Sequence, residues 1–277
     1  MITINNNMYV LDTDNTSYAF AVLGSGQLEH LYYGRKLHAN EAVMTEKHTF
    51  IPGNTNVYNK DYSSYSLEDV CLEMSSLGKG DIREPFIEVT YPNGSSTTDM
   101  VFDRAEIIQG KEEYDTLPGS YDDNGEVEQL VIYLKDRNYN LTLELHYYVY
   151  EKCDIITRSA KLVNSGNESV RLERLMSMQL DLNESDYELS FFNGAWAREM
   201  NRSRIPIRAG KYVNESVTGT SSNRANPFFM IGRSSTTEDY GECYGFNLIY
   251  SGNHYEAAQV NSCLLYTSPS PRDTERS

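Results

Sequence analysis

The strongest candidate for binding a ligand is the single tryptophan of the chain. The chain has 22 tyrosines and 9 phenylalanines but a single tryptophan, Trp196, in the segment NGAWAREM at residues 193–200. The small residues beside it leave space for a partner on the indole face, which suits the apolar C–H side of a sugar ring. Arg198 and Glu199 add polar groups of the kind found in saccharide sites. The alternative is that a lone tryptophan is the largest residue of a β-rich core.

No other pattern in the sequence is typical of catalysis or metal binding. The five histidines are widely spaced and lack a second ligand at metal spacing, which favours structural or solvent-facing roles. No glycine-rich phosphate loop and no Gly-x-Ser-x-Gly elbow occurs, and the carboxylates form no pair that spacing alone would select. We therefore predict no catalytic residue, metal site or cofactor in this chain. The histidines are His30, His38, His48, His146 and His254.

Alternation of apolar and polar residues predicts several strands in the part of the chain that precedes Trp196. Residues 18–32 read as a hairpin around Gly24 and Gly26, and residues 130–134 and 141–149 alternate in the same way. Residues 156–162 lead to a turn, after which Val170 to Leu180 would run back as a further long strand. The expected fold is all-β: a large antiparallel sandwich of two sheets packed face to face.

Two short segments depart from this pattern. Residues 66–75 place Leu67, Val70, Cys71 and Met74 at helical spacing and are the one helical candidate. Gly78 and Gly80 permit a tight turn with positive φ.

Composition excludes several classes of protein. The chain has 277 residues and a net charge of −16, which argues against nucleic acid as a partner because phosphate contacts need clustered lysine and arginine. No apolar stretch is long enough to span a bilayer, and no secretion signal is visible. The four cysteines show no metal or redox spacing, so we expect free, buried thiols in a cytoplasmic protein. They are Cys71, Cys153, Cys243 and Cys263.

Six motifs in a fixed order resemble the N-terminal domain of family 36 glycoside hydrolases, the bacterial α-galactosidases. Together they cover the chain from its start to about residue 262. They are SLED at 66–69, SLGKGDIREP at 76–85, YEKCDIITRS at 150–159, NGAWARE at 193–199, SSNRANPF at 221–228 and YGFNLIYSGN at 244–253.

The resemblance implies a β-sandwich over residues 1–262, the supersandwich that precedes a (β/α) barrel. In the family, that barrel holds two catalytic aspartates of a retaining mechanism, and neither has a counterpart here. The resemblance also implies a tetramer in which the tryptophan of the sandwich reaches the sugar pocket of a neighbouring subunit. This implies that Trp196 contacts substrate, and that the partners are α-galactoside oligosaccharides and further copies of the chain.

Other positions differ from the family pattern or take no role in it. Relatives can place an acidic residue in the loop where this chain has Lys47 and His48, and they often have Ser-His where it has Ser222 and Asn223. No substrate contact is carried over to these residues. In the glycine turn, we expect Asp81 and Arg83 to pair as a structural brace.

The last segment, residues 263–277, breaks the family pattern. It resembles the translated read-through of a transposon-end adapter from shotgun sequencing libraries, and we expect it not to be native. A genuine Pro/Ser-rich linker is the alternative.

The sequence thus predicts the N-terminal fragment of a retaining α-galactosidase that hydrolyses terminal α-galactosides of the raffinose and melibiose type. This fragment alone would be inactive. It would contribute a subunit interface and, through Trp196, one wall of the pocket. The alternative is a non-catalytic module for carbohydrate binding or assembly.

Overall fold

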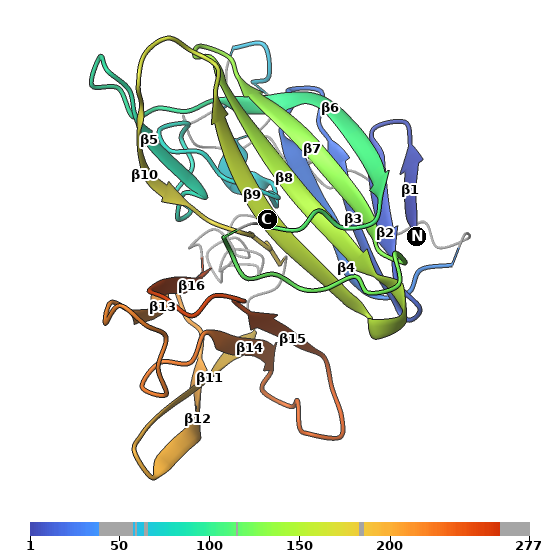
Figure 1. Ribbon diagram of the computed structural model, residues 1–277, viewed down its shortest axis with the longest axis vertical. Helices are drawn as coiled ribbons and strands as arrows, with labels where there is room; N and C mark the ends of the chain where they lie inside the picture. Colours follow the sequence, from blue (N-terminus) through green and yellow to red (C-terminus); the bar gives the residue numbers. More distant parts are fainter. Residues whose placement is uncertain (39–57, 59, 64–65, 115, 183–185, 261–277) are drawn as a thin grey trace, which may run out of the picture. The chain divides into compact units, whose positions relative to one another are not determined.

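The computed structural model describes residues 1–38, 58, 60–63, 66–114, 116–182 and 186–260, which form two compact units. Unit 1 comprises Met1–Glu112 and Tyr121–Asp181, and unit 2 comprises Glu113–Ser120 and the chain from Leu182 onward. Each unit is built from antiparallel strands (Figure 1). Within the described residues, no helix has the length and apolar character needed to cross a membrane.

The first sheet of unit 1 contains four antiparallel strands in sequence order, β1 to β4. The predicted hairpin is confirmed, because β3 and β4 pair from Val22 opposite Leu28 to Thr16 opposite Arg35. The strands are β1 (Ile2–Asn5), β2 (Met8–Asp12), β3 (Thr16–Val22) and β4 (Leu28–Arg35).

The second sheet of unit 1 is an antiparallel meander with the order β6-β7-β8-β9. Strand β8 confirms the strand predicted for residues 141–149 and buries its apolar face, but burial alternates only as far as Leu145, because His146 and Tyr148 on the opposite face are buried as well. A 3-10 helix, η2 (Glu151–Cys153), connects β8 to β9. The strands are β6 (Met100–Gln109), β7 (Glu128–Asp136), β8 (Leu141–Tyr150) and β9 (Ile155–Asn164).

The core of unit 1 lies between these two sheets, as predicted for a sandwich. Phe20 on β3 and Tyr147 on β8 stack with ring centroids 5.2 Å apart, and Leu11 and Leu143 are fully buried in the same cluster. Figure 1 shows the strands of one sheet facing those of the other. Burial of this many large apolar side chains is the main source of the unit's stability.

The prediction of one long strand from Val170 to Leu180 is wrong. Only β10 (Arg171–Leu175) forms, and it pairs with β5 (Ile87–Thr90), not with β9. Beyond Met176 the backbone is used by other partners: the carbonyl of Gln179 accepts a hydrogen bond from Arg158 at 2.7 Å. The alternating sequence pattern extends to Leu180, but β5 begins at Ile87, opposite Leu175, and supplies no hydrogen-bonding partners beyond that residue.

The helix expected over residues 66–75 is also largely absent. A 3-10 helix, η1 (Leu67–Asp69), forms behind a Ser66 capping box, and the chain is extended from Val70. The backbone N–H groups of His30 and Glu73 then bond the carbonyls of Cys71 and Leu28 across the edge of β4. Pairing with an existing sheet edge therefore replaced the helical turn that the spacing suggested.

The glycine turn is a brace, as predicted. Gly78 and Gly80 have φ of 83° and 77°, and Arg83 lies 3.1 Å from Asp81. The Arg83 guanidinium also donates to the carbonyls of Leu67 and Glu68, so it ties the turn to η1.

Unit 2 contains two antiparallel sheets of its own. A four-stranded sheet has the order β12-β11-β14-β15, and a two-stranded sheet pairs β13 with β16. The strands are β11 (Tyr187–Ala195), β12 (Arg198–Pro206), β13 (Gly210–Ser216), β14 (Phe228–Arg233), β15 (Cys243–Asn247) and β16 (His254–Val260). The all-β fold class is therefore confirmed in both units.

Candidate functional site

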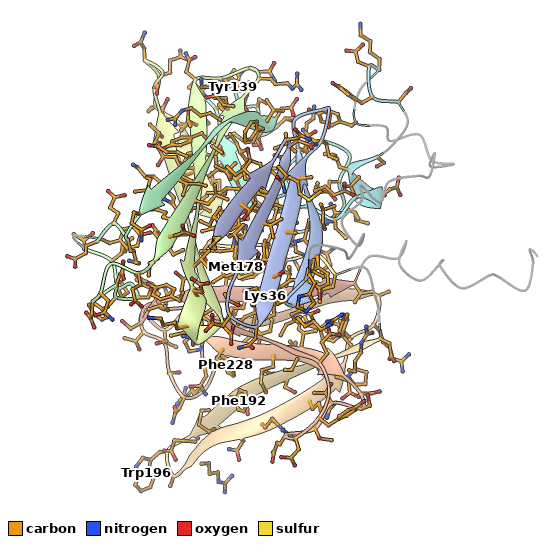
Figure 2. All side chains as sticks on the ribbon, turned by 90° about the vertical axis from the view of Figure 1, so that its right-hand side faces the viewer. Lys36, Tyr139, Met178, Phe192, Trp196 and Phe228 are labelled. Atoms are coloured by element: carbon orange, nitrogen blue, oxygen red, sulfur yellow. The ribbon has the colours of Figure 1, made fainter. Side chains whose placement is uncertain are left out.

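Trp196 lies in the turn that joins β11 to β12. Ala195 and Arg198 are opposite each other in the ladder, so only Trp196 and Ala197 connect the strands. The pairing shifts register between Asn193 and Ala195, which marks an irregularity just before the turn. The turn thus carries Trp196 at the outer end of a hairpin (Figure 2).

The Trp196 side chain is 90% exposed. The alternative of a core tryptophan is therefore wrong for this chain. Arg198, Glu199 and Met200, the first residues of β12, are exposed as well. The turn presents a flat apolar ring beside charged groups, an arrangement that suits a ligand with both apolar C–H and hydroxyl surfaces.

Backbone geometry at the turn explains why the sequence is rich in small residues. A Cβ atom at position 194 would lie 2.1 Å from the carbonyl oxygen of Arg198, so only glycine fits there. Ala197 and Met200 have φ of 58° and 54°, in the left-handed region that non-glycine residues rarely adopt.

Two side-chain hydrogen bonds close the turn. The Ala197 N–H donates to Oε1 of Glu199 at 2.9 Å, and Nδ2 of Asn201 donates to the carbonyl of Arg198 at 2.5 Å. These contacts tie the backbone on either side of the turn to side chains of β12.

The remaining candidates from the sequence fall elsewhere or outside the described residues. Ser222 Oγ accepts a hydrogen bond from the Arg224 N–H, which gives Ser222 a local structural contact. Lys47 and His48 lie outside the described residues, as does the segment 263–277. Among the residues described, no group of histidine, cysteine and acidic side chains could hold a metal.

The cysteines agree only in part with expectation. Among the described residues, Cys71, Cys153 and Cys243 form no disulfide, but Cys71 is only partly buried, and Cys153 and Cys243 are exposed. Both lie at the end of a strand or in a connection, where the apolar alternation no longer directs them to the core.

Sequence reasoning missed a polar network in the core of unit 1, centred on the fully buried carboxylate of Glu73. Tyr18 and Tyr147 each donate to it at 2.7 Å. His30 Nδ1 lies 2.8 Å from Oε1, and Arg158 lies 3.2 Å from Oε2. Arg158 and Tyr147 occupied inward positions in the predicted strands, which was the one available signal.

The network shifts the pKa values of Glu73, Tyr18 and Tyr147. Burial alone would raise the pKa of the Glu73 carboxyl, but the charge of Arg158 and the hydrogen bond from His30 hold it below its ordinary value. Burial raises the pKa of Tyr18 and Tyr147 well above that of a free tyrosine. Each group is satisfied by another and sealed from solvent, so the network serves the fold and cannot receive a substrate.

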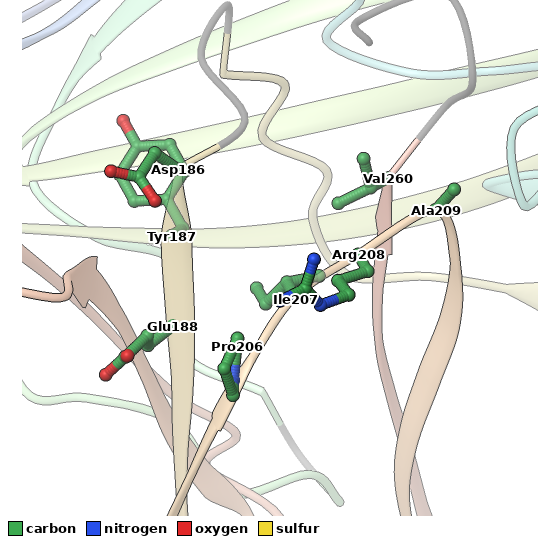
Figure 3. Close-up of a pocket in the computed structure, with 8 residues that line it drawn as sticks. All are labelled: Asp186, Tyr187, Glu188, Pro206, Ile207, Arg208, Ala209 and Val260. Atoms are coloured by element: carbon green, nitrogen blue, oxygen red, sulfur yellow. The ribbon is translucent and has the colours of Figure 1, made fainter.

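An open cavity of about 440 Å³ lies at the other end of β11, in unit 2 (Figure 3). Its polar lining includes Asp186, Glu188 and Arg208, and Val260 lies on its far side. None of the residues predicted to bind substrate lines it, so Trp196 and its turn remain the candidate site.

Comparison with known proteins relates this geometry to a family. The model described as "Glycosyl hydrolase family 36 N-terminal domain" matches residues 26–264. The α-galactosidase AgaA of Geobacillus stearothermophilus is 35% identical over 91% of this chain and 34% of its own length. The bifunctional α-galactosidase/sucrose kinase AgaSK of Mediterraneibacter gnavus is 34% identical over 90% of the chain and 27% of its own length.

Solved structures agree with the sequence relatives. The α-galactosidase of Lactobacillus brevis superposes with a TM-score of 0.87 at 35% identity, covering 94% of this chain and 36% of that one. A variant of G. stearothermophilus AgaA in complex with raffinose superposes with a TM-score of 0.84 at 32% identity, covering 92% and 36%. The chain spans between about a quarter and about a third of the length of these relatives.

Proposed function

The chain belongs to glycosyl hydrolase family 36 as its N-terminal domain, and from this premise we propose that it is part of a retaining α-galactosidase. The substrates would be terminal α-galactosides of the raffinose and melibiose type. Support comes from relatives that are α-galactosidases, two of them variants solved with raffinose and stachyose.

The retaining mechanism uses two carboxyl groups with different chemical roles. One attacks the anomeric carbon while the other protonates the leaving oxygen, and the second then activates the water that releases galactose. We assign neither role to this chain. Its own contribution would be a contact surface between subunits of a homo-oligomer, a tetramer by resemblance, and one wall of the sugar pocket.

A single observation carries the substrate role: the sole tryptophan is 90% exposed at the end of a hairpin. Burying a large aromatic side chain in the core would stabilise the fold by roughly 1.5–3 kcal/mol, and this exposed ring does not contribute that energy. A galactoside from a neighbouring subunit's pocket would cover the indole face and recover part of that energy. Exposed free thiols at Cys153 and Cys243 fit a cytoplasmic enzyme.

The test is substitution of Trp196 in the full-length enzyme. Trp196→Ala should lower kcat/KM about ten- to a hundredfold, because aromatic stacking contributes roughly 1–3 kcal/mol per ring contact. Trp196→Phe should recover part of the loss, since it keeps a smaller stacking face. Unchanged kcat/KM in a folded Ala variant would remove Trp196 from the pocket.

The isolated chain provides a second test. It should leave p-nitrophenyl α-galactoside intact, because the proposed catalytic carboxylates are not among its residues. A titration with raffinose, followed by the emission of Trp196, tests the alternative of a carbohydrate-binding module. Saturable quenching by the isolated chain would favour that module; no change would favour a wall that needs its neighbouring pocket.

A further inference from the structure

We infer that Gly194 and Glu199 are positioning residues that fix the direction of the Trp196 indole before substrate arrives. The inference rests on the proposed stacking role of Trp196. It concerns how the turn is built, which the stacking role alone does not explain.

Neighbouring side chains do little to hold an indole that is 90% exposed, so the backbone of the turn must set its direction. Two features define that backbone. The carbonyl of Arg198 occupies the space where a Cβ of residue 194 would lie, 2.1 Å away. The Glu199 carboxylate accepts the Ala197 N–H at 2.9 Å, directly after the tryptophan.

The same turn holds Ala197 and Met200 at φ of 58° and 54°. Left-handed conformations of non-glycine residues are strained and persist only where surrounding contacts determine them. Burial contributes little to this exposed turn, so it is held by the ladder pair Ala195–Arg198 and by the hydrogen bonds of Glu199 and Asn201. Strain kept at an exposed tip is typical of elements that are pre-organised for a ligand.

Pre-organisation reduces the ordering cost of binding. Fixing one side chain at an interface corresponds to a factor of about two to ten in affinity. Glu199→Ala should therefore lower kcat/KM of the full-length enzyme about two- to tenfold. Glu199→Gln keeps an Oε1 acceptor and should retain nearly full activity, whereas Gly194→Ala should lose more than Glu199→Ala because the turn must open.

A matched glycine is available on β15 of the same sheet. A Cβ at Gly245 would meet the Phe228 ring at 3.7 Å, an ordinary contact, so Gly245→Ala should leave kcat/KM unchanged. Glu215→Ala, at an exposed glutamate on β13, is the matched control for Glu199→Ala.

The isolated chain gives a readout that does not depend on activity. Ala195 and Ala197 flank Trp196, so labelling alanine with ¹⁵N reports on the turn itself. Their heteronuclear NOE values should equal those of Ala19 and Ala21, which are buried in β3, and should fall in Glu199→Ala but not in Glu199→Gln.

A double-mutant cycle separates positioning from direct action. In the Trp196→Ala background, Glu199→Ala should cause no further loss of kcat/KM, because the residue it positions is absent. Losses from Glu199→Ala that persist in this background, or that Glu199→Gln shares, would overturn the inference and place the carboxylate on the substrate. A rigid Ala197 amide and unchanged kcat/KM in Glu199→Ala would also overturn it. A Trp196→Ala enzyme with normal kcat/KM would instead refute the stacking role, and the NMR result would still test the turn.

Discussion

Glu73 and Glu199 both accept hydrogen bonds from their own chain, but one is sealed in the core of unit 1 and the other is exposed at a turn of unit 2. The buried glutamate has the features usually sought in an active site: clustered ionisable groups and shifted pKa values. The exposed glutamate lies beside Trp196, where a ligand can reach it. The comparison shows that a perturbed cluster indicates function only where a substrate can reach it.

The two regions also divide their energetic roles. The Glu73 network satisfies its own charges inside unit 1, so removing a member leaves another buried and unpaired. The Trp196 turn buries little, so its side chains can change without cost to the fold.

Glu73→Ala should lower the free energy of unfolding by about 3–5 kcal/mol, because Arg158 would remain buried without its carboxylate. Urea denaturation of the isolated chain measures this. The control is Glu173→Ala, which removes an exposed partner of Arg171 and should cost less than about 1 kcal/mol. Equal midpoints for the two variants would show that the Glu73 network does not hold unit 1 together.

Unit 2 contains a buried carboxyl group whose pKa is shifted in the opposite direction from that of Glu73, namely Glu256. Burial raises its pKa from 4.5 to about 7, and the hydrogen bond from Asn214 lowers it only in part. The folded state then binds the proton more tightly than the unfolded state does, so this contribution is complete below pH 4.5 and is lost as pH rises through 7. Glu73, with its lowered pKa, contributes in the reverse sense and is lost as pH falls.

Comparing the stability of Glu256→Gln with that of the unaltered chain between pH 5 and 8 isolates the pH-dependent contribution of Glu256. Relative to the variant, the unaltered chain should lose up to about 3 kcal/mol of unfolding free energy as pH rises. Parallel stability curves for the two proteins would contradict the assignment. Asn214→Ala, which removes the donor to Glu256, should steepen the same dependence.

Trp196→Ala should change the unfolding free energy of the isolated chain by no more than about 0.5 kcal/mol, the range for exposed positions. A core tryptophan would cost about 3–5 kcal/mol instead. Thermal unfolding followed by circular dichroism measures the difference. A strongly lowered midpoint would break the contrast between the two regions.

Deletion of residues 263–277 should have the smallest effect, again within about 0.5 kcal/mol, if that segment is not native. The same unfolding assay applies, with recovery of the codons from independently prepared genomic DNA as the sequence control. Loss of folding on deletion would argue for a native segment that contributes to unit 2.

Several strands of unit 1 could be predicted from local pattern, whereas the strands of unit 2 were not. Period-two alternation predicted β8 and the β3–β4 hairpin, because each strand's own side chains decide which face is buried. Small residues around Trp196 indicated an uncrowded position, and the turn places it there. The family motifs indicated the fold class and, by resemblance, the substrate contact.

Partner choice was not available from local pattern. The segment from Val170 has the alternation of a long strand, but its length was set by β5, more than eighty residues earlier in the chain. Residues 66–75 have helical spacing, yet the backbone groups of Cys71 and Glu73 form hydrogen bonds with the edge of β4 in an extended conformation.

The Glu73 network shows the same limit for side chains. Its acidic centre lay in a segment predicted to be helical, and its cation, Arg158, is separated from it by 85 positions along the chain. The sequence by itself determined the β3–β4 hairpin and the apolar face of β8, because those depend on neighbouring residues, whereas it left Trp196 between a ligand contact and a core position. Which strand meets which, and which charges meet in the core, was decided by the tertiary structure, because such contacts depend on the free energy of the whole packed unit.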